Sequence, residues 1–543
     1  MSEQKKILLS ITNLKKYFPV AKTSIFQREQ FYVRANENIS LDIYEGETIG
    51  IVGESGCGKS TLGRVILQLY DQTAGNTIYY GKTRDDLTPK YVIDTIKHSR
   101  RYRKKYRKAK LAREKEEQKV AEAGGEEKAD FFALQSLNLA RCEEKTRYDN
   151  IVKIFGGFFA LEDGTGIPEL KAEYKALSRR NKLKKKLDKT ETDLRHETDR
   201  TERRSDSKIA RLTQKSDALR SKLASAEEGV AKARADLTAL RTYCAGKPGF
   251  AEAEAERDEG TDLSRLRYNE MRFLRKDMQI IFQDPYSSLN PRFTIGQIIE
   301  EGLVTHDFYR HGSPKMREHI VNTMVECGLQ EYMLYRYPHQ FSGGQRQRIS
   351  IARALAVHPK FIVCDECVSA LDVSIQSQII NLLQELKEKE QLTYMFISHD
   401  LSVVKYISDR ICVMYLGSVV ELADSATIFK DPRHPYTVAL LSSIPTTDIE
   451  SLDRDRIILE GNIPSPIKPP SGCKFHTRCY MACDKCKRVP PPLREIEPGH
   501  FVACHFPERK IDENGNYLFD LPDMEKKSKK AGRSEDEASG GQE

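Results

Sequence analysis

A glycine-rich segment near the N-terminus has the residue types that hold a phosphate chain. It consists, in order, of Gly53, Glu54, Ser55, Gly56, Cys57, Gly58, Lys59, Ser60 and Thr61. A β-like run precedes the segment and a helix-like run follows it, so its glycines would let backbone N–H groups approach a phosphate at a helix N-terminus. We expect Lys59 to reach the β- and γ-phosphates and Ser60 to ligate Mg²⁺. The segment predicts nucleotide binding, and the alternative is a fortuitous glycine-rich turn.

A pair of carboxylates ends a predicted buried strand. Residues 361–364 are apolar and are followed by Asp365 and Glu366. In a parallel sheet the carboxyl ends of the strands meet at one edge, which would deliver both acids to the nucleotide. We expect Asp365 to hold Mg²⁺ through water and Glu366 to polarise the attacking water. Alone, such a pair is more often a capped turn; the phosphate loop favours the functional interpretation.

The segment FSGGQRQR predicts a second anion site at a helix N-terminus, formed by Ser342, Gly343, Gly344 and Gln345. The nucleotide held by Lys59 does not need it, so it would serve another nucleotide across a dimer interface. Here the sequence resembles the ATP-binding cassette family. Members of that family form head-to-tail dimers, with two ATP molecules between the phosphate loop of one subunit and this signature of the other.

The other motifs of that family follow in its usual order, and the resemblance implies a role for each. Gln283, in FQDPYSSLNPR, is similar to the lid glutamine that contacts Mg²⁺ and senses the membrane partner. Asp372, in SALD, resembles the dimer-contact residue, and His399, in FISHD, the switch histidine. Lys59, Gln283, Glu366 and His399 are therefore the expected catalytic residues.

The adenine contact and the fold class follow from the same resemblance. Phe18 matches the aromatic position that stacks on adenine, with Tyr17 and Tyr32 as competitors. Alternating strand-like and helix-like segments argue for an α/β fold. The family implies a nucleotide-binding domain with a RecA-like core, an antiparallel β-subdomain and a helical subdomain.

Longer strings are more specific. GESGCGKSTLGR, FQDPYSSLNPR, SALDVSIQSQ and HPYTVALLSSIP resemble the ATPase subunits of bacterial oligopeptide and dipeptide importers, closest to the F-subunit type. This implies a homologous ATPase partner in a heterodimer, two membrane-spanning permeases and an extracytoplasmic peptide-binding protein, with the chain peripheral on the cytoplasmic face of the membrane. A chromosome-maintenance or translation-factor ATPase is the rival, because those proteins also combine such a cassette with coiled coils. Cys367 departs from the family, which usually has Pro after the catalytic Glu.

Length and composition exclude several classes of protein. The chain has 543 residues, 39% of them hydrophobic, and a formal net charge of +8. This excludes a wholly disordered chain, and no apolar run approaches the roughly 18 to 20 residues that span a bilayer. Twelve Cys in so long a chain do not indicate a disulfide scaffold. We expect a cytosolic protein.

The excess charge is concentrated in residues 85–262, which hold 41 basic and 34 acidic residues. Apolar residues at helical spacing within 172–243 predict a charged coiled coil, as a hairpin that turns near residues 203–207. The alternative is a mobile charged segment. Importers of the family have no counterpart of this segment, which could bind an additional partner, such as a protein, anionic lipid or RNA. A solvated outgrowth without a ligand is equally compatible with the sequence.

The C-terminal region is rich in Pro and Cys. Cys473, Cys479, Cys486 and Cys504 match the four-cysteine pattern that the importer subfamily associates with an iron–sulfur cluster. Spacing alone allows a [4Fe–4S] cluster, Zn²⁺ or a metal-free reduced tail. The expected division of the chain is into a first cassette part, the charged helical insertion, the rest of the cassette, a Cys-rich extension and a disordered tail: 1–84, 85–262, 263–445, 446–510 and 511–543.

Overall fold

The computed structural model describes residues 5–21, 31–126, 129, 131–199, 205–443, 457–507, 510–511 and 517–518. The predicted disordered tail falls almost entirely outside these residues. Among the helices that the structure describes, none is long and apolar enough to span a membrane.

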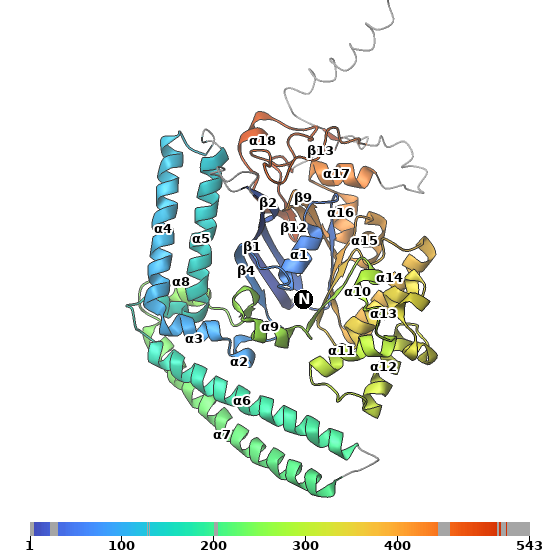
Figure 1. The fold of residues 1–543 in the computed structure, drawn as a ribbon. Coiled ribbons are helices and arrows are strands. Elements are labelled where there is room, and N and C mark those ends of the chain that lie inside the picture. Colours follow the sequence, from blue (N-terminus) through green and yellow to red (C-terminus); the bar gives the residue numbers. More distant parts are fainter. Residues whose placement is uncertain are drawn as a thin grey trace, which may run out of the picture.

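A mixed eight-stranded sheet lies at the centre of the molecule (Figure 1), in the order β11-β12-β10-β9-β3-β8-β7-β6. From β9 to β6 neighbouring strands are parallel. The strands are β3 (Thr48–Val52), β6 (Met278–Ile281), β7 (Phe361–Asp365), β8 (Thr393–Ile397), β9 (Arg410–Tyr415), β10 (Ser418–Asp424), β11 (Arg494–Glu497) and β12 (His500–Val502). Strands β3, β7 and β8 are buried at every position, as expected for a parallel sheet covered on both faces.

The second sheet is antiparallel, in the order β2-β1-β4-β5. Its strands are β1 (Ile7–Pro19), β2 (Tyr32–Tyr44), β4 (Ala74–Tyr79) and β5 (Thr261–Asp262). Although about 180 residues separate β4 from β5 along the chain, Ile78 pairs with Asp262 and Tyr79 with Thr261. The intervening segment therefore leaves the sheet and returns to it at the same place.

The segment between β4 and β5 is helical. It contains α2 (Arg84–Leu87), α3 (Lys90–Lys97), α4 (Ser99–Glu122), α5 (Phe131–Phe155), α6 (Ile167–Thr198), α7 (Asp206–Cys244) and α8 (Phe250–Ala255). Figure 1 shows α4 beside α5 on the left of the molecule and α6 beside α7 below it. A separate apolar cluster, which includes Ile151, Phe155, Phe158, Leu237 and Phe250, joins the bases of the two helix pairs.

Helices α6 and α7 pack along one another. The apolar residues predicted to face a partner helix are buried or half-buried, among them Leu177, Leu187 and Leu237. The predicted turn at 203–207 lies partly outside the described residues, and α7 begins at Asp206. Ser205 caps it by accepting a hydrogen bond from the Lys208 backbone N–H.

Apart from α1, the remaining helices follow β5 along the chain. Those on the right in Figure 1 include α10 (Pro285–Ser288), α11 (Ile295–Thr305), α12 (Pro314–Glu326), α13 (Gly343–Leu355) and α14 (Val373–Glu390). The others are α1 (Lys59–Ile66), α9 (Tyr268–Leu274), α15 (Leu401–Ile407), α16 (Ser425–Lys430), α17 (Pro435–Ser442) and α18 (Asp484–Arg488). The C-terminal part, with α17 and α18, covers the top of the central sheet (Figure 1).

Candidate functional site

The phosphate loop connects the buried strand β3 to α1, as the sequence predicts. Gly53 and Gly58 have φ values of 147° and 100°, which disfavour other residue types. A Cβ at Gly53 would lie 2.2 Å from the Met414 carbonyl oxygen, and one at Gly58 would lie 2.1 Å from that of Ala35. Both glycines are therefore required by close backbone packing, which shapes the loop into a cradle before the N-terminus of α1.

Lys59 lies under this loop. Its side chain is 4% exposed, and its ammonium donates hydrogen bonds to the carbonyl oxygens of Gly53 at 2.7 Å and Glu54 at 3.1 Å. Ser55 and Gly56 are exposed at the loop surface, while Ser60 and Thr61 in the first turn of α1 are half-buried. The cation is thus already held at the loop, where it would meet the phosphate groups of a nucleotide.

The carboxylate at the end of β7 has the features of a magnesium ligand. Asp365 is 2% exposed and accepts a hydrogen bond from Arg64 of α1 at 3.2 Å through Oδ2. Its other oxygen, Oδ1, is buried without a hydrogen-bond partner in the described structure. A buried acceptor without a partner is costly, and a water molecule of a Mg²⁺ shell would satisfy it. The donor set formed by Asp365 and Ser60 fits the ion.

The three other predicted catalytic side chains meet at the same sheet edge. Gln283 follows β6, Glu366 follows β7 and His399 follows β8, which are consecutive strands of the sheet. The Gln283 amide donates to Glu366 Oε2 at 2.8 Å, and His399 Nδ1 lies 3.8 Å from the same oxygen. Glu366 has a φ of 49°, an uncommon value for a residue other than glycine. The strained backbone holds the carboxylate between the Gln283 amide and the His399 imidazole, as a general base or water-orienting group would be held.

The predicted signature forms the N-terminus of α13, away from the phosphate loop of the same chain (Figure 1). Ser342 is the N-cap: its Oγ accepts from the Gln345 N–H at 3.3 Å, and the Gln345 side chain accepts from the Ser342 N–H at 3.1 Å. Gly344 packs against Ile375, since a Cβ there would lie 2.5 Å from its Cγ2. Asp372 is the exposed N-cap of α14. The structure thus groups Asp372 with the signature and not with Lys59.

An unpredicted contact connects α10, which follows Gln283, to α13, which begins at the predicted signature. The guanidinium of Arg346 in α13 lies 3.7 Å from the ring centre of Tyr286 in α10, three residues after Gln283. Arg346 also donates to the Pro338 carbonyl at 2.8 Å. A cation–π pair of this kind links the two motifs physically. The sequence contains both residues but nothing in their spacing places them in contact.

The predicted adenine contact lies at the end of β1. Phe18 is half-buried and packs edge-on against Tyr70, with 5.5 Å between ring centres, and the Lys16 ammonium lies 4.7 Å from its ring. Tyr17 instead donates its hydroxyl to Glu37 at 2.7 Å. Tyr17 is therefore engaged in a polar contact, which favours Phe18 between these two neighbours.

The C-terminal region reaches the phosphate loop directly, which sequence reasoning missed. Arg478 donates two hydrogen bonds to the Glu54 carboxylate, at 2.7 and 3.1 Å. The Tyr436 hydroxyl accepts from the Glu54 backbone N–H at 2.8 Å. Phe475 packs among Tyr415 and Tyr436, so the loop is held from a region more than 370 residues distant in sequence.

The four predicted thiols converge beside these contacts. Cys473, Cys479, Cys486 and Cys504 line one cavity of about 20 Å³. Burial, together with the three neighbouring thiols, raises the pKa of the Cys479 thiol to about 12. In the part of the chain that the structure describes, no three His, Cys, Asp or Glu side chains are arranged as a metal site. The donor set suits a metal or cluster, but its geometry is not preformed.

Family profiles and individual relatives agree in the kind of protein that this chain resembles. The profile of the ABC transporter family matches residues 36–190 and 238–369, and that of the oligopeptide/dipeptide transporter C-terminal region matches residues 420–486. The putative oligopeptide transport ATP-binding protein YkfD of Bacillus subtilis is 54% identical over 248 residues, which cover 45% of this chain and 75% of the relative. The oligopeptide transport ATP-binding protein AppF of the same organism is 50% identical over 281 residues, covering 51% of this chain and 83% of AppF. A dimeric ATP-binding cassette solved with ADP and phosphate aligns with 77% of this chain and 99% of its own, at 17% identity and a TM-score of 0.39.

Proposed function

Because this chain belongs to the ABC transporter family, we propose that it is the ATP-hydrolysing subunit of an importer of oligopeptides or dipeptides. The observation that carries the proposal is the meeting of Gln283, Glu366 and His399 at the sheet edge that also bears the phosphate loop. The peptide substrate is inferred from relatives that are named as oligopeptide transport ATP-binding proteins.

In this proposal ATP and Mg²⁺ are the working ligands. The phosphate loop and Lys59 bind the β- and γ-phosphates, Phe18 stacks on adenine, and Ser60, Asp365 and Gln283 hold Mg²⁺ directly or through water. Bound Mg²⁺ neutralises charge on the phosphates. Glu366 orients the attacking water, and His399 and Gln283 hold that carboxylate in position, which the 2.8 Å Gln283 contact supports.

The remote position of the signature supports a composite site. Ser342, Gly343, Gly344, Gln345 and Asp372 would contact the nucleotide held by a second ATPase subunit, and that subunit would supply its own signature to Lys59. We infer a heterodimer with a homologous ATPase, docked on two membrane-spanning permeases that receive peptide from an extracytoplasmic binding protein. The chain would then lie on the cytoplasmic face of the membrane.

We further propose that residues 85–262 are an insertion into the antiparallel sheet, with α6 and α7 as a coiled-coil hairpin. The pairing of β4 with β5 supports this, since the sheet is continuous across the segment. The cassette would then comprise 1–84 and 263–445. Residues 446–510 would form an extension whose Cys473, Cys479, Cys486 and Cys504 bind a [4Fe–4S] cluster, or Zn²⁺ as the alternative, and 511–543 a disordered tail. Metal analysis of anaerobically purified protein distinguishes iron with sulfide from zinc.

The test of the ATPase assignment is the substitution Glu366→Gln. It removes the carboxylate but keeps the shape, so we expect turnover to fall by at least about a hundredfold while ATP binding persists. Glu385→Gln makes the same change on the exposed face of α14 and should leave both quantities unchanged. Undiminished hydrolysis in the Glu366 variant would contradict the assignment. Peptide uptake by the reconstituted complex tests the substrate separately.

A further inference from the structure

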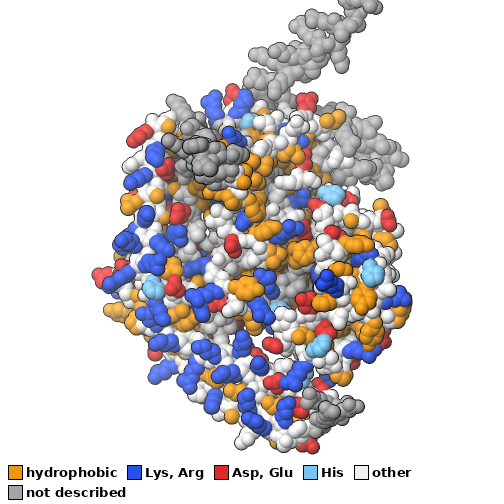
Figure 2. All heavy atoms as spheres, viewed as in Figure 1, with side chains coloured by type: hydrophobic (Ala, Val, Ile, Leu, Met, Phe, Trp, Pro, Cys, Tyr) orange, Lys and Arg blue, Asp and Glu red, His pale blue; other side chains and the backbone are white. Residues whose placement is uncertain are grey.

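Cationic side chains that the nucleotide site does not use gather in one open groove between α3, α6 and α9. The groove has a volume of about 1270 Å³ and is lined by ten lysines and three arginines but only four carboxylates. Nine net positive charges therefore face one cavity. Since the net charge of the whole chain is +8, the net charge of all residues outside the groove is −1. Figure 2 shows Lys and Arg gathered over the lower left of the molecule, where Figure 1 shows α3, α6 and α7.

These cations are not neutralised by the protein. Within the described residues, none of the thirteen has a carboxylate at ion-pairing distance, whereas nearby Arg234 and Arg241 both have one. Two of the groove's four acids have other partners: Asp86 accepts from the Thr83 N–H and hydroxyl, each at 3.0 Å, and Glu270 accepts from the Lys90 N–H at 2.8 Å. The uncompensated charge makes the groove a strong attractor for a polyanion.

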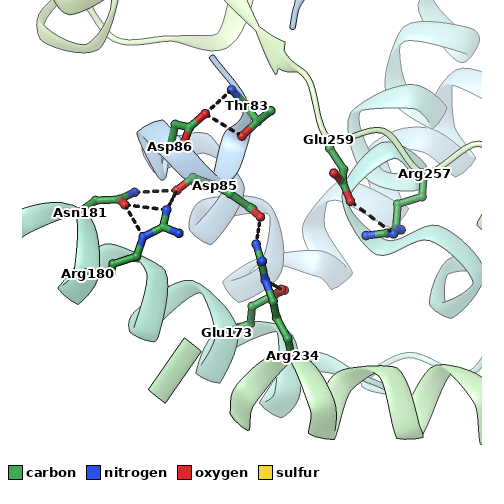
Figure 3. A network of polar contacts seen from close by, with 9 residues as sticks. All are labelled: Thr83, Asp85, Asp86, Glu173, Arg180, Asn181, Arg234, Arg257 and Glu259. Carbon is green, nitrogen blue, oxygen red and sulfur yellow. Dashed lines mark hydrogen bonds and ion pairs between the residues drawn. The ribbon is translucent and has the colours of Figure 1, made fainter. Parts of the chain in front are cut away.

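The walls of the groove are held in place at both ends. Figure 3 shows Arg180 and Asn181 of α6 donating to the Asp85 carbonyl, each at 2.7 Å, and Arg234 of α7 in an ion pair with the Asp85 carboxylate. At the far end of α6, Asp193 and Asp199 pair with Arg310 and Lys315, at 3.1 and 2.8 Å. These bonds hold α6 against α2 at one end and against the start of α12 at the other, so this wall of the groove is positioned before any ligand binds, which lowers the entropy cost of binding.

The groove's side chains suit phosphate groups better than nucleic-acid bases. Lysines act as point charges towards phosphate, while single-stranded nucleic acid also requires aromatic rings on which its bases stack. Phe273 is flanked by the ammonium groups of Lys185 at 6.0 Å and Lys276 at 5.0 Å. Tyr174 donates its hydroxyl to the Thr88 carbonyl at 2.9 Å. Tyr174 is half-buried and Phe273 is 41% exposed, so the described lining offers bases one exposed phenyl ring and not the succession of rings on which several bases could stack.

We propose that this groove docks the chain onto anionic phospholipid headgroups of the membrane that carries its permease partners. The inference rests on the proposed function for the nearness of a membrane, and on the groove for the ligand chemistry. Each lysine near an anionic membrane surface contributes a screened attraction, and ten together give a salt-dependent attachment. The groove would steady the ATPase on the bilayer beside the permeases.

The test uses the purified full-length chain and two matched variants. In the groove variant, Lys182, Lys184, Lys185 and Lys186 become Gln; in the control, Lys104, Arg107, Lys108 and Lys110 of α4 become Gln. All eight side chains are exposed, and Gln is compatible with a helix, so both variants lose four charges with little effect on folding. Co-sedimentation is measured with phosphatidylcholine vesicles, with and without phosphatidylglycerol, and circular dichroism monitors folding.

We expect wild type to bind only the anionic vesicles and to release them in high salt, and the groove variant to bind at least about tenfold more weakly than the control variant. Equal weakening of both variants, or equal binding to neutral vesicles, overturns the proposal. So does tighter binding to a single-stranded RNA oligonucleotide than to anionic vesicles at the same ionic strength. ATP hydrolysis is assayed without vesicles, so that a failure of the ATPase assignment is seen independently of lipid binding.

Discussion

Replacing Arg478 by Ala tests whether the Cys-rich region controls the phosphate loop. The Arg478 side chain is 7% exposed and the Glu54 carboxylate that it clasps is 25% exposed. Removal of Arg478 would leave that carboxylate without its charged partner, and of the two C-terminal contacts to Glu54 described above only the Tyr436 hydrogen bond would remain. We therefore expect the substitution to affect nucleotide binding, through Glu54 and the phosphate loop, as well as stability.

The size of the effect follows from burial. Breaking a fully buried pair costs about 3–5 kcal/mol, and partial exposure of Glu54 to water reduces the expected cost to about 2 kcal/mol. In a unit of more than about 250 residues that lowers Tm by about 4 °C or less. If all of this free energy serves to hold the binding-competent loop, ATP binding weakens by about thirtyfold, which sets the upper limit.

Titration with a fluorescent ATP analogue and thermal unfolding measure the two effects. Arg488→Ala, at an exposed arginine of the same region, is the matched control and should change neither quantity. A double-mutant cycle with Glu54→Gln isolates the pair, since a variant without Glu54 has nothing left for Arg478 to hold. A coupling free energy near zero, or an unchanged Kd for ATP in Arg478→Ala, would refute the reasoning.

Three further substitutions have defined outcomes. Burial alone would raise the pKa of the Glu37 carboxyl, but the Lys474 ammonium outweighs it and lowers this pKa to about 2. The charged carboxylate therefore stabilises the fold above pH 4.5 by about 3 kcal/mol. This contribution is lost as the pH falls from 4.5 to 2. Glu37→Gln should flatten Tm against pH in that window. Gly58→Ala places a Cβ 2.1 Å from the Ala35 carbonyl at a φ of 100°, and should cost at least about 2 kcal/mol and nucleotide affinity. Arg234→Ala removes the ion pair at the base of α7 and should speed hydrogen exchange in α2, while exchange in β3 stays unchanged.

The grouping of the candidate site residues was largely predictable from sequence, because they follow consecutive parallel strands of one sheet. Each motif ends or begins an element, so strand order alone brings Gln283, Glu366 and His399 together. The same logic separates Ser342 from Lys59, since the signature begins a helix of another layer. Local sequence motifs were therefore sufficient to group residues wherever the order of the strands brings the ends of those motifs together.

Contacts between distant, irregular segments were not predictable in this way. Arg478 reaches Glu54 from a loop whose course depends on the packing of Phe475 among Tyr415 and Tyr436, and no periodicity records such packing. The Tyr286–Arg346 contact is of the same kind. Side chains that connect layers are set by tertiary structure, so sequence reasoning identifies their types but not their partners.

The distribution of charge shows most clearly what the structure adds to the sequence. Along the sequence, the excess of basic over acidic residues lies in residues 85–262, where it is spread over several helices. In the structure, Lys82, Arg267 and Lys276 join it from outside that segment, while many of its own cations are paired with nearby acids. A segment of mixed charge thereby presents a single groove with nine uncompensated charges. Helical outgrowths that serve only as solvated spacers have no reason to segregate charge in this way, and this segregation favours a ligand over a passive role for the hairpin.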